Sequence, residues 1–298
     1  MSDTAHTPET GALIVLTRLD SNRVPGKGLI DLGGRPLLGR VLDRLRRCAV
    51  LDRIIVATTD RPGDDPIADF AADEGIPVFR GSAEDVAIRI YEAAAAAGLT
   101  WFVRICGDSP FVAPEVIDRV AETFLVAQPD ICTNVHPRTF PIGCSAEAVG
   151  MDAMERLLGE TKAPEHREHV TAWFYENADA VRLVNVAAPD ARYDGTSIAV
   201  DWPEEVEMGR WILTRLDTPA EAPLDLIVDH ARAWWARAER GTRASGDRRE
   251  PVQKGRQAQA PAATTQPSQP VRQRHNNAVL PGAVGSQEAH HRDQKHRT

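Results

Sequence analysis

Three cationic residues follow a short apolar run near the start of the chain. Residues 12–16 have the composition of a buried strand, and Arg18, Arg23 and Lys27 come next in a loop bent by Pro25-Gly26. An open α/β sheet usually holds its ligand at the carboxyl end of its first strand. Guanidinium and ammonium groups at that place suit a polyphosphate. The pattern predicts a phosphate-binding loop, and an ordinary solvated basic loop is the alternative.

Two aspartates end apolar runs farther along the chain. Residues 101–106 lead into Gly107-Asp108, and residues 197–200 lead into Asp201, which a helical pattern follows. Mg²⁺ typically takes one or two carboxylates together with phosphate oxygens and water. Asp108 and Asp201 are therefore predicted to hold Mg²⁺ beside the basic loop. The alternatives are a common Gly-Asp turn at residue 108 and a helix N-cap at Asp201, whose carboxylate would then accept a backbone N–H.

Strand and helix patterns alternate along the chain, and this order predicts a three-layer α/β/α fold with a mostly parallel, Rossmann-like sheet. The expected strands are residues 12–16, 53–59, 77–79, 101–106, 130–133, 181–186 and 197–200. The expected helices are residues 37–47, 65–74, 83–97, 114–126, 151–158, 166–176, 203–216 and 224–238.

The charge of the chain is unevenly distributed. All 298 residues hold 35 basic and 43 acidic groups, but residues 241–298 hold ten basic and four acidic, which leaves 25 and 39 in the body. The tail is thus +6 and the body −14, and an acidic body argues against a nucleic-acid partner. After Trp235 there is no aromatic residue, no Ile and one Leu. We expect residues 1–10 and 239–298 to be disordered and residues 11–238 to form the folded domain.

Neither a membrane-spanning segment nor a secretory leader is apparent, so a cytoplasmic protein without a membrane partner is expected. The four cysteines, at positions 48, 106, 132 and 144, are widely spaced and contain no Cys-x-x-Cys pair. Such spacing favours reduced thiols over disulfides or a zinc site.

Several motifs together resemble one enzyme family. Arg18-x-x-Ser21-x-Arg23-Val24-Pro25-Gly26-Lys27 is similar to the opening signature of cytidylyltransferases that activate sugar acids as CMP derivatives. The spore-coat-polysaccharide type is the branch that it resembles, and this type is related to the synthetases for CMP-3-deoxy-manno-octulosonate and CMP-acylneuraminate. The similarity continues in order over residues 12–215, through Phe79-Arg80-Gly81-Ser82, Val103-Arg104-x-x-Gly107-Asp108-x-Pro110, Arg167-Glu168-His169 and Val200-Asp201-x-Pro203-Glu204.

This resemblance implies a nucleotide-diphospho-sugar transferase fold, often a homodimer, and a role for each matching residue. The catalytic residues would be Lys27, Asp108 and Asp201, with the two aspartates as metal ligands. The other residues divide into a triphosphate group (Arg18, Ser21 and Arg23, with Lys27), a base group (Arg80 and Ser82) and an acceptor group (Arg104, Arg138, Glu147 and His169). Arg138 could pair with a sugar carboxylate, and His169 could equally be an ordinary surface or core histidine.

The predicted reaction is Mg²⁺-dependent transfer of CMP from CTP to a sugar acid or related polyol, with release of pyrophosphate. Two departures from the family pattern bear on it: Leu16-Thr17 replaces Gln-Ala, and Asp20 replaces a glycine in the phosphate loop. Asp20 would repel a triphosphate unless it turned outward or joined the metal. The alternatives are a glycosyltransferase that uses a finished nucleotide sugar on the same fold, and a noncatalytic protein that binds sugar nucleotides.

Overall fold

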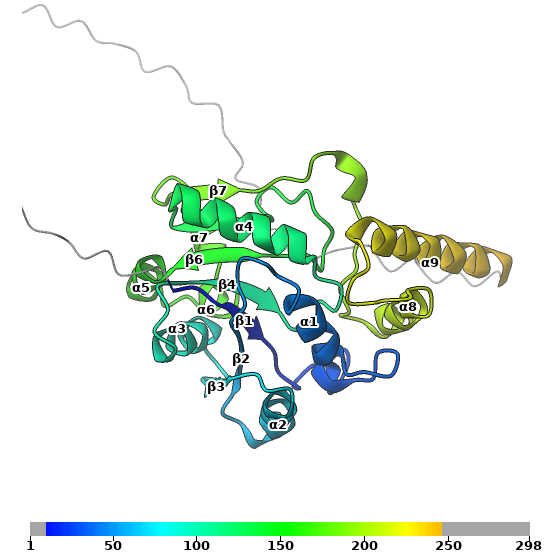
Figure 1. Ribbon diagram of the computed structural model, residues 1–298, viewed down its shortest axis with the longest axis horizontal. Coiled ribbons are helices and arrows are strands. Elements are labelled where there is room, and N and C mark those ends of the chain that lie inside the picture. The colour runs from blue at the N-terminus through cyan, green and yellow to red at the C-terminus, as the bar shows by residue number, and fades with distance from the viewer. Residues whose placement is uncertain (1–9, 246–298) are drawn as a thin grey trace, which may run out of the picture. The chain divides into compact units, whose positions relative to one another are not determined.

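The computed structural model describes residues 10–245, and its centre is one mostly parallel sheet of seven strands (Figure 1). The order across the sheet is β3-β2-β1-β4-β6-β5-β7, and β6 is antiparallel to both of its neighbours. The strands are β1 (Leu13–Leu16), β2 (Ile54–Thr59), β3 (Val78–Gly81), β4 (Trp101–Cys106), β5 (Ile131–Thr133), β6 (Glu147–Gly150) and β7 (Leu183–Asn185). The predicted fold class is confirmed.

Helices cover both faces of this sheet. They are α1 (Leu37–Leu45), α2 (Asp65–Asp73), α3 (Val86–Ala96), α4 (Pro114–Ala127), α5 (Met151–Glu160), α6 (Pro164–Glu168), α7 (Ala172–Glu176), α8 (Pro203–Leu213) and α9 (Leu224–Ser245). Short 3-10 turns lie at η1 (Lys27–Leu29), η2 (Pro62–Asp64) and η3 (Ala191–Tyr193). None of these helices is long and apolar enough to cross a bilayer.

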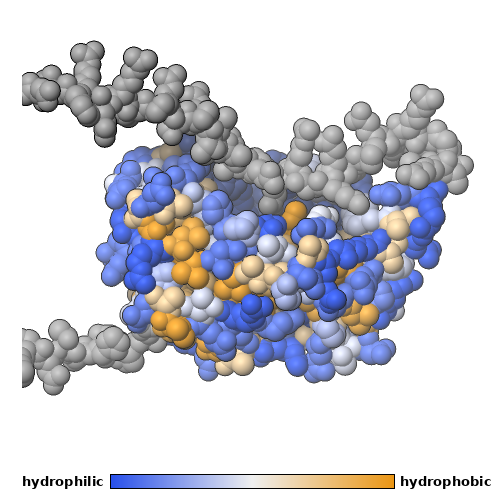
Figure 2. All heavy atoms as spheres, turned by 90° about the horizontal axis from the view of Figure 1, so that it is seen from above, coloured by the Kyte–Doolittle hydropathy of each residue, from blue (hydrophilic) through white to orange (hydrophobic). Residues whose placement is uncertain are grey.

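The alternation of side chains along the strands creates two separate apolar cores. Leu13 and Val15 of β1 pack in the core beneath α1, α4, α8 and α9, whereas Ile14 packs in the core beneath α3, α5 and α7. Strands buried on both faces are apolar at successive positions, as a covered parallel sheet requires. The face of the molecule in Figure 2 is mainly hydrophilic, with hydrophobic residues in separate patches.

The strand order contains a switch point at β1, which lies between β2 and β4. β1 pairs in parallel with β2 on one side and with β4 on the other. The chain therefore leaves β1 in one direction across the sheet toward β2 and β3, and later returns to the other side at β4. Ligands of open α/β sheets bind at the carboxyl ends of strands at such a switch. The loops after β1 and β4 meet there.

Three expected elements differ in the structure. The helix expected over residues 166–176 is two short helices, because the chain turns at His169 and buries Val170 in a core. Residues 197–200 form no strand within the described chain, and Ser197 makes only an isolated bridge with Ile142. α9 continues past residue 238 to Ser245. The rest of the segments expected to be disordered, residues 1–9 and 246–298, lies outside the described residues.

Candidate active site

The loop after β1 is held in place by its own short-range hydrogen bonds. Gly26 adopts φ +70°, a left-handed conformation that favours glycine, and its N–H donates to the Leu19 carbonyl at 3.1 Å. The Ser21 hydroxyl accepts the Val24 N–H at 3.2 Å, and the buried Asp64 carboxylate accepts the Leu19 N–H at 2.7 Å. Ser21 thus shapes the loop that carries the cations.

Asp108 reaches this loop because the residue before it has no side chain. A Cβ on Gly107 would lie 2.6 Å from the Cβ of Thr17 and 2.9 Å from the Leu16 carbonyl oxygen. The Gly107 N–H donates to that same carbonyl at 2.8 Å. Since only glycine allows this approach, β4 delivers Asp108 directly against the end of β1.

Asp201 comes to the same place through backbone pairing outside the sheet. The Val200 N–H donates to the Asp108 carbonyl at 3.1 Å, and the Ile198 N–H donates to the Ile142 carbonyl at 2.8 Å. Glu205, in the first turn of α8, accepts the Asp201 N–H at 2.6 Å and the Trp202 N–H at 3.1 Å. The N-cap interpretation of Asp201 is wrong, because Trp202 is the N-cap residue and the Asp201 carboxylate accepts from Lys27 and Arg23.

The carboxylates of Asp108 and Asp201 converge on the ammonium of Lys27. The Lys27 Nζ lies 3.0 Å from Asp108 Oδ2 and 2.7 Å from Asp201 Oδ1, and only 12% of its side chain is exposed. Burial alone would lower the pKa of this lysine, but the two aspartates outweigh that effect and raise it. Lys27 is therefore charged at neutral pH and bridges two carboxylates.

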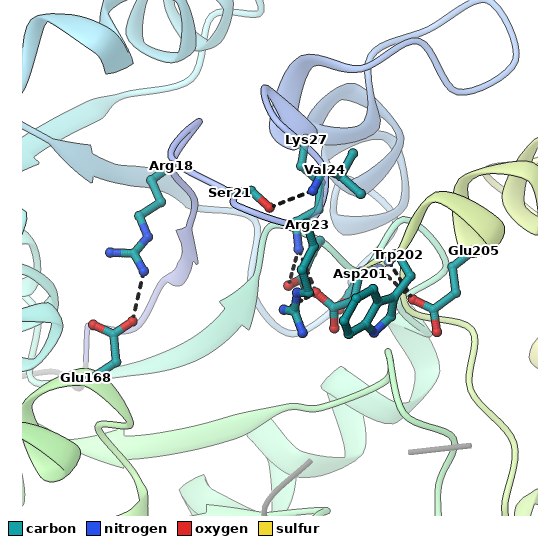
Figure 3. A network of polar contacts seen from close by, with 11 residues as sticks. Arg18, Ser21, Arg23, Val24, Lys27, Glu168, Asp201, Trp202 and Glu205 are labelled. Atoms are coloured by element: carbon teal, nitrogen blue, oxygen red, sulfur yellow. Dashed lines mark hydrogen bonds and ion pairs between the residues drawn. The ribbon is translucent and has the colours of Figure 1, made fainter. Parts of the chain in front are cut away.

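Arg23 and Trp202 form the outer edge of this cluster (Figure 3). The Arg23 guanidinium lies 3.1 Å from Asp201 Oδ1, and its carbon lies 5.1 Å from the centroid of the Trp202 ring. The Trp202 side chain is 45% exposed, which is unusual for a residue of its size. An exposed indole directly beside Asp201 is a feature that the sequence analysis overlooked.

Arg18 lies apart from these residues and pairs with Glu168 of α6 at 3.1 Å (Figure 3). Asp20, the residue that replaces a family glycine, pairs with Arg61 at 3.1 Å and is more than half exposed. Its carboxylate is therefore balanced by a cation from outside the loop and is open to solvent.

The two residues expected to face the base lie in β3 and directly after it, Arg80 within the strand and Ser82 just past its end. Arg80 pairs with Asp65 at 2.6 Å and donates to the carbonyls of Thr59 and Arg61 at 3.1 and 2.8 Å. The Ser82 hydroxyl accepts the Asp85 N–H at 3.0 Å, just before α3 begins. The structure shows no direct contact between this pair and the Lys27 cluster within the described residues.

The acceptor candidates form a second polar group on β4 and β6. Arg104 and Glu147 face each other across the two strands in an ion pair, and the Tyr175 hydroxyl donates to Glu147. Burial would raise the pKa of Glu147, but Arg104 and Tyr175 outweigh it and the pKa is lowered. Glu147 is therefore ionised at neutral pH and serves as the counter-ion of Arg104.

Arg138 lies near this pair and makes no ion pair in the described part of the chain. It donates to Ser145 Oγ at 3.1 Å and to the Pro141 carbonyl at 3.5 Å. Burial, its largest influence, lowers the pKa of Arg138. His169 is exposed, and its side chain makes no hydrogen bond or ion pair with residues 10–245.

All four cysteines are free thiols, as predicted. Burial raises the pKa of Cys106 to about 11 and that of Cys132 to about 12, so both stay protonated at neutral pH. Within residues 10–245, no group of three or more His, Cys, Asp or Glu side chains is placed to hold a metal ion.

The geometry of this site is accompanied by a direct match to known proteins. A family model described as cytidylyltransferase matches residues 12–205, more than half of the chain. The chain belongs to the cytidylyltransferase family. It is therefore a CTP-dependent nucleotidyltransferase, and the resemblance inferred from its motifs is confirmed.

Two curated relatives and one solved structure illustrate the similarity. The spore coat polysaccharide biosynthesis protein SpsF of Bacillus subtilis is 28% identical over 200 residues, 65% of this chain and 82% of that protein. A 3-deoxy-manno-octulosonate cytidylyltransferase of Nitratidesulfovibrio vulgaris is 35% identical over 131 residues, 42% of this chain and half of that protein. A cytidylyltransferase structure from Leptospira borgpetersenii superposes with a TM-score of 0.71 at 25% identity, and the match covers 78% of this chain and 96% of that one.

Proposed function

We propose that this cytidylyltransferase moves CMP from CTP to a sugar acid or related polyol and releases pyrophosphate. The observation that carries the proposal is the convergence of the Asp108 and Asp201 carboxylates on one cation at the β1–β4 switch. SpsF, by its name, serves polysaccharide biosynthesis, and the second relative is named for a sugar acid. Both names support an acceptor of this class.

Arg18, Arg23 and Lys27 would bind the triphosphate. Each now faces a carboxylate, Arg18 facing Glu168 and the other two facing Asp201. The phosphates of CTP offer the same kind of charged acceptor to these groups, and arginine can bind phosphate in a bidentate manner. Nucleotide binding would therefore be an exchange of anionic partners around fixed cations, with Ser21 holding the loop.

Asp108 and Asp201 suit a magnesium ion. Their oxygens already lie within hydrogen-bonding distance of one ammonium, so they can face a single cation without rearrangement of the backbone. Two carboxylates are sufficient for Mg²⁺ when phosphates and water complete its shell. When bound, the ion would offset negative charge on the phosphates during transfer.

The chemistry is a substitution at the α-phosphorus of CTP. A hydroxyl of the acceptor attacks in line, an O–P bond forms to the acceptor, the bond to the β-phosphate oxygen breaks, and pyrophosphate leaves with those electrons. Lys27, Arg23 and Arg18 would stabilise charge on the departing phosphates, and rigid cations need little reorganisation to do so. Asp108 is the carboxylate proposed to receive the hydroxyl proton.

Two further groups of residues complete the proposal. Arg80 and Ser82 would face the cytosine, and Arg138 would pair with the carboxylate of the acceptor because no carboxylate of the described chain balances its buried charge. Arg104, held by Glu147, and the exposed His169 would line the same acceptor side. A homodimer and a cytoplasmic location remain predictions.

The test is a pyrophosphate-release assay with each of the four ribonucleoside triphosphates, Mg²⁺ and a panel of sugar acids, neutral sugars and polyols. We expect release with CTP and a sugar acid, and loss of that preference in Arg138→Met. The control is Arg119→Met, since Arg119 is an exposed arginine of α4 whose side chain, within residues 10–245, donates to the Ala187 carbonyl. Nucleotide-sugar hydrolysis without pyrophosphate release would contradict the proposal and favour a glycosyltransferase.

A further inference from the structure

Arg89 of α3 is a buried cation that the site described above does not use. It is 2% exposed, although its neighbours on the same helix face are the apolar residues Val86, Ile90 and Ala93. Burying an arginine is costly unless its donors are satisfied. Arg89 makes no ion pair within residues 10–245, and its Nε lacks any hydrogen-bond partner there. Burial lowers the pKa of Arg89, and the nearby Arg18 lowers it further.

One hydrogen bond of Arg89 connects it to the nucleotide site. Its guanidinium donates to the carbonyl oxygen of Ser82, the residue proposed to face the base. The Ser82 hydroxyl in turn accepts the Asp85 N–H at 3.0 Å, and Asp85 caps α3 by accepting the Ile88 N–H at 2.8 Å. Arg89 thus anchors the segment of residues 82–85, whose other hydrogen bonds lead into α3.

A second buried arginine shows what a purely structural role looks like in this chain. Arg44 of α1 is also 2% exposed, and burial also lowers its pKa. It donates to the carbonyl of Val112 and to those of Pro219 and Ala222 in the loop before α9, and so ties α1 to two other backbone segments. Within residues 10–245, the Arg89 side chain, by contrast, donates to one carbonyl, that of Ser82.

We propose that Arg89 is a positioning residue of the nucleotide site, which fixes the Ser82 carbonyl so that the loop after β3 can distinguish cytosine from uracil. The inference rests on the proposed use of CTP. Cytosine presents an amino donor where uracil presents a carbonyl acceptor. The Ser82 carbonyl oxygen has a second lone pair besides the one that Arg89 occupies, so, once fixed, it can accept from the amino group of cytosine but not from the carbonyl of uracil. A site built to hydrogen-bond one group discriminates strongly against an analogue that lacks it.

The test measures kcat/KM for CTP and for UTP in the full-length protein. Arg89→Met should lower the CTP-to-UTP ratio about tenfold or more, the effect of one misplaced hydrogen bond. Arg89→Lys should also lower the ratio, to a smaller extent, because an ammonium lacks the planar fork that fixes the carbonyl. Arg44→Met is the matched control and should keep the wild-type ratio even if its melting temperature falls.

The outcomes separate this inference from the proposed function. A wild type that releases no pyrophosphate from CTP overturns the proposed function. A wild type that prefers CTP, with Arg89→Met keeping that preference, overturns the role of Arg89 alone. If Arg89→Met does not fold, Arg89→Lys decides, and a wild-type ratio in that variant overturns the inference. An equal loss of preference in Arg44→Met would also overturn it.

Discussion

Lys27 connects the two carboxylates of the candidate site, because its ammonium takes part in two ion pairs at once. With 12% of the Lys27 side chain exposed and both partners within 3.0 Å of its ammonium, these are partly buried ion pairs rather than surface ones. Exposed ion pairs contribute little to stability, whereas breaking a buried one leaves an uncompensated charge. Lys27 therefore has a stabilising role in the free protein in addition to its proposed role toward phosphate.

The raised pKa of Lys27 predicts a pH dependence of stability. A lysine whose folded pKa lies above its unfolded value of 10.5 stabilises the fold fully below pH 10.5, and this stabilisation is lost as the pH rises through the folded value. The difference in unfolding free energy between wild type and Lys27→Met should therefore be constant from pH 7 to 9 and shrink at higher pH. Chemical denaturation at pH 7, 9 and 11 checks this. A difference that stays constant at pH 11 would contradict the assigned contacts.

Asp201 offers a second prediction at the residue scale. Asp201→Asn removes the charge that faces Lys27 and Arg23, so turnover should fall by orders of magnitude. The free energy of unfolding should change by only about 1–2 kcal/mol. Pyrophosphate release at several Mg²⁺ concentrations and a denaturant titration measure the two effects. Asp225→Asn is the control, since Asp225 also pairs with an arginine but its partners are Arg192 and Tyr193 and not Lys27 or Arg23. Full activity in Asp201→Asn would exclude the two-carboxylate site.

The sequence predicted the charged groups at the centre of the site, but not the residues that hold them in position. Lys27 and Asp108 could be placed together because strand ends of a parallel sheet meet at one edge. Asp201 was placed with them on the same argument, although the segment before it reaches the site by pairing with Asp108 outside the sheet. Glu205 and Arg89 were missed, since both lie inside helical patterns where a charged residue usually faces solvent. The one local signal for Arg89 is its spacing, which puts it three residues from Val86 and four from Ala93, both buried.

At the scale of elements, α8 positions Asp201 through its first turn. Glu205 accepts two backbone N–H groups there, and burial raises the pKa of this carboxylate. The segment before α8 pairs with Asp108 and Ile142 instead of joining the sheet, so the cap and these backbone bonds are what orient it. Sequence periodicity alone indicates a strand for residues 197–200, because a short run of apolar residues such as Ile198, Ala199 and Val200 is buried in either arrangement.

Glu205→Ala should therefore lower both stability and activity. Loss of a capping carboxylate costs about 1 kcal/mol, and the freed Asp201 backbone should reduce kcat more than it raises the KM for CTP. Thermal unfolding and steady-state kinetics measure these effects. Glu204→Ala is the matched control, because Glu204 lies in the same turn and is exposed. If the two variants behave alike, the helix dipole rather than the cap explains the result.

At the scale of the whole molecule, the acidic body and the basic tail differ in charge and in composition. Residues 246–298 contain no Phe, Trp, Tyr or Ile and one Leu, so they offer little material for an apolar core. A chain ending at Ser245, the last residue of α9, should keep the melting temperature and CTP affinity of the full chain. Differential scanning calorimetry and isothermal titration check this. A fall in either value would assign the tail a role in the fold or in nucleotide binding.

The three cations of the loop after β1 are already paired with carboxylates in the free protein, and this should affect how fast a nucleotide binds. Because Arg18, Arg23 and Lys27 already face carboxylates, the free site projects little positive potential into solvent, and the body around it carries a formal charge of −14. A nucleotide approaching from bulk water therefore meets net repulsion once it comes within about 10 Å, the screening length at moderate salt. Stopped-flow measurements should show an association rate that rises with ionic strength, the reverse of what an openly basic phosphate loop would give.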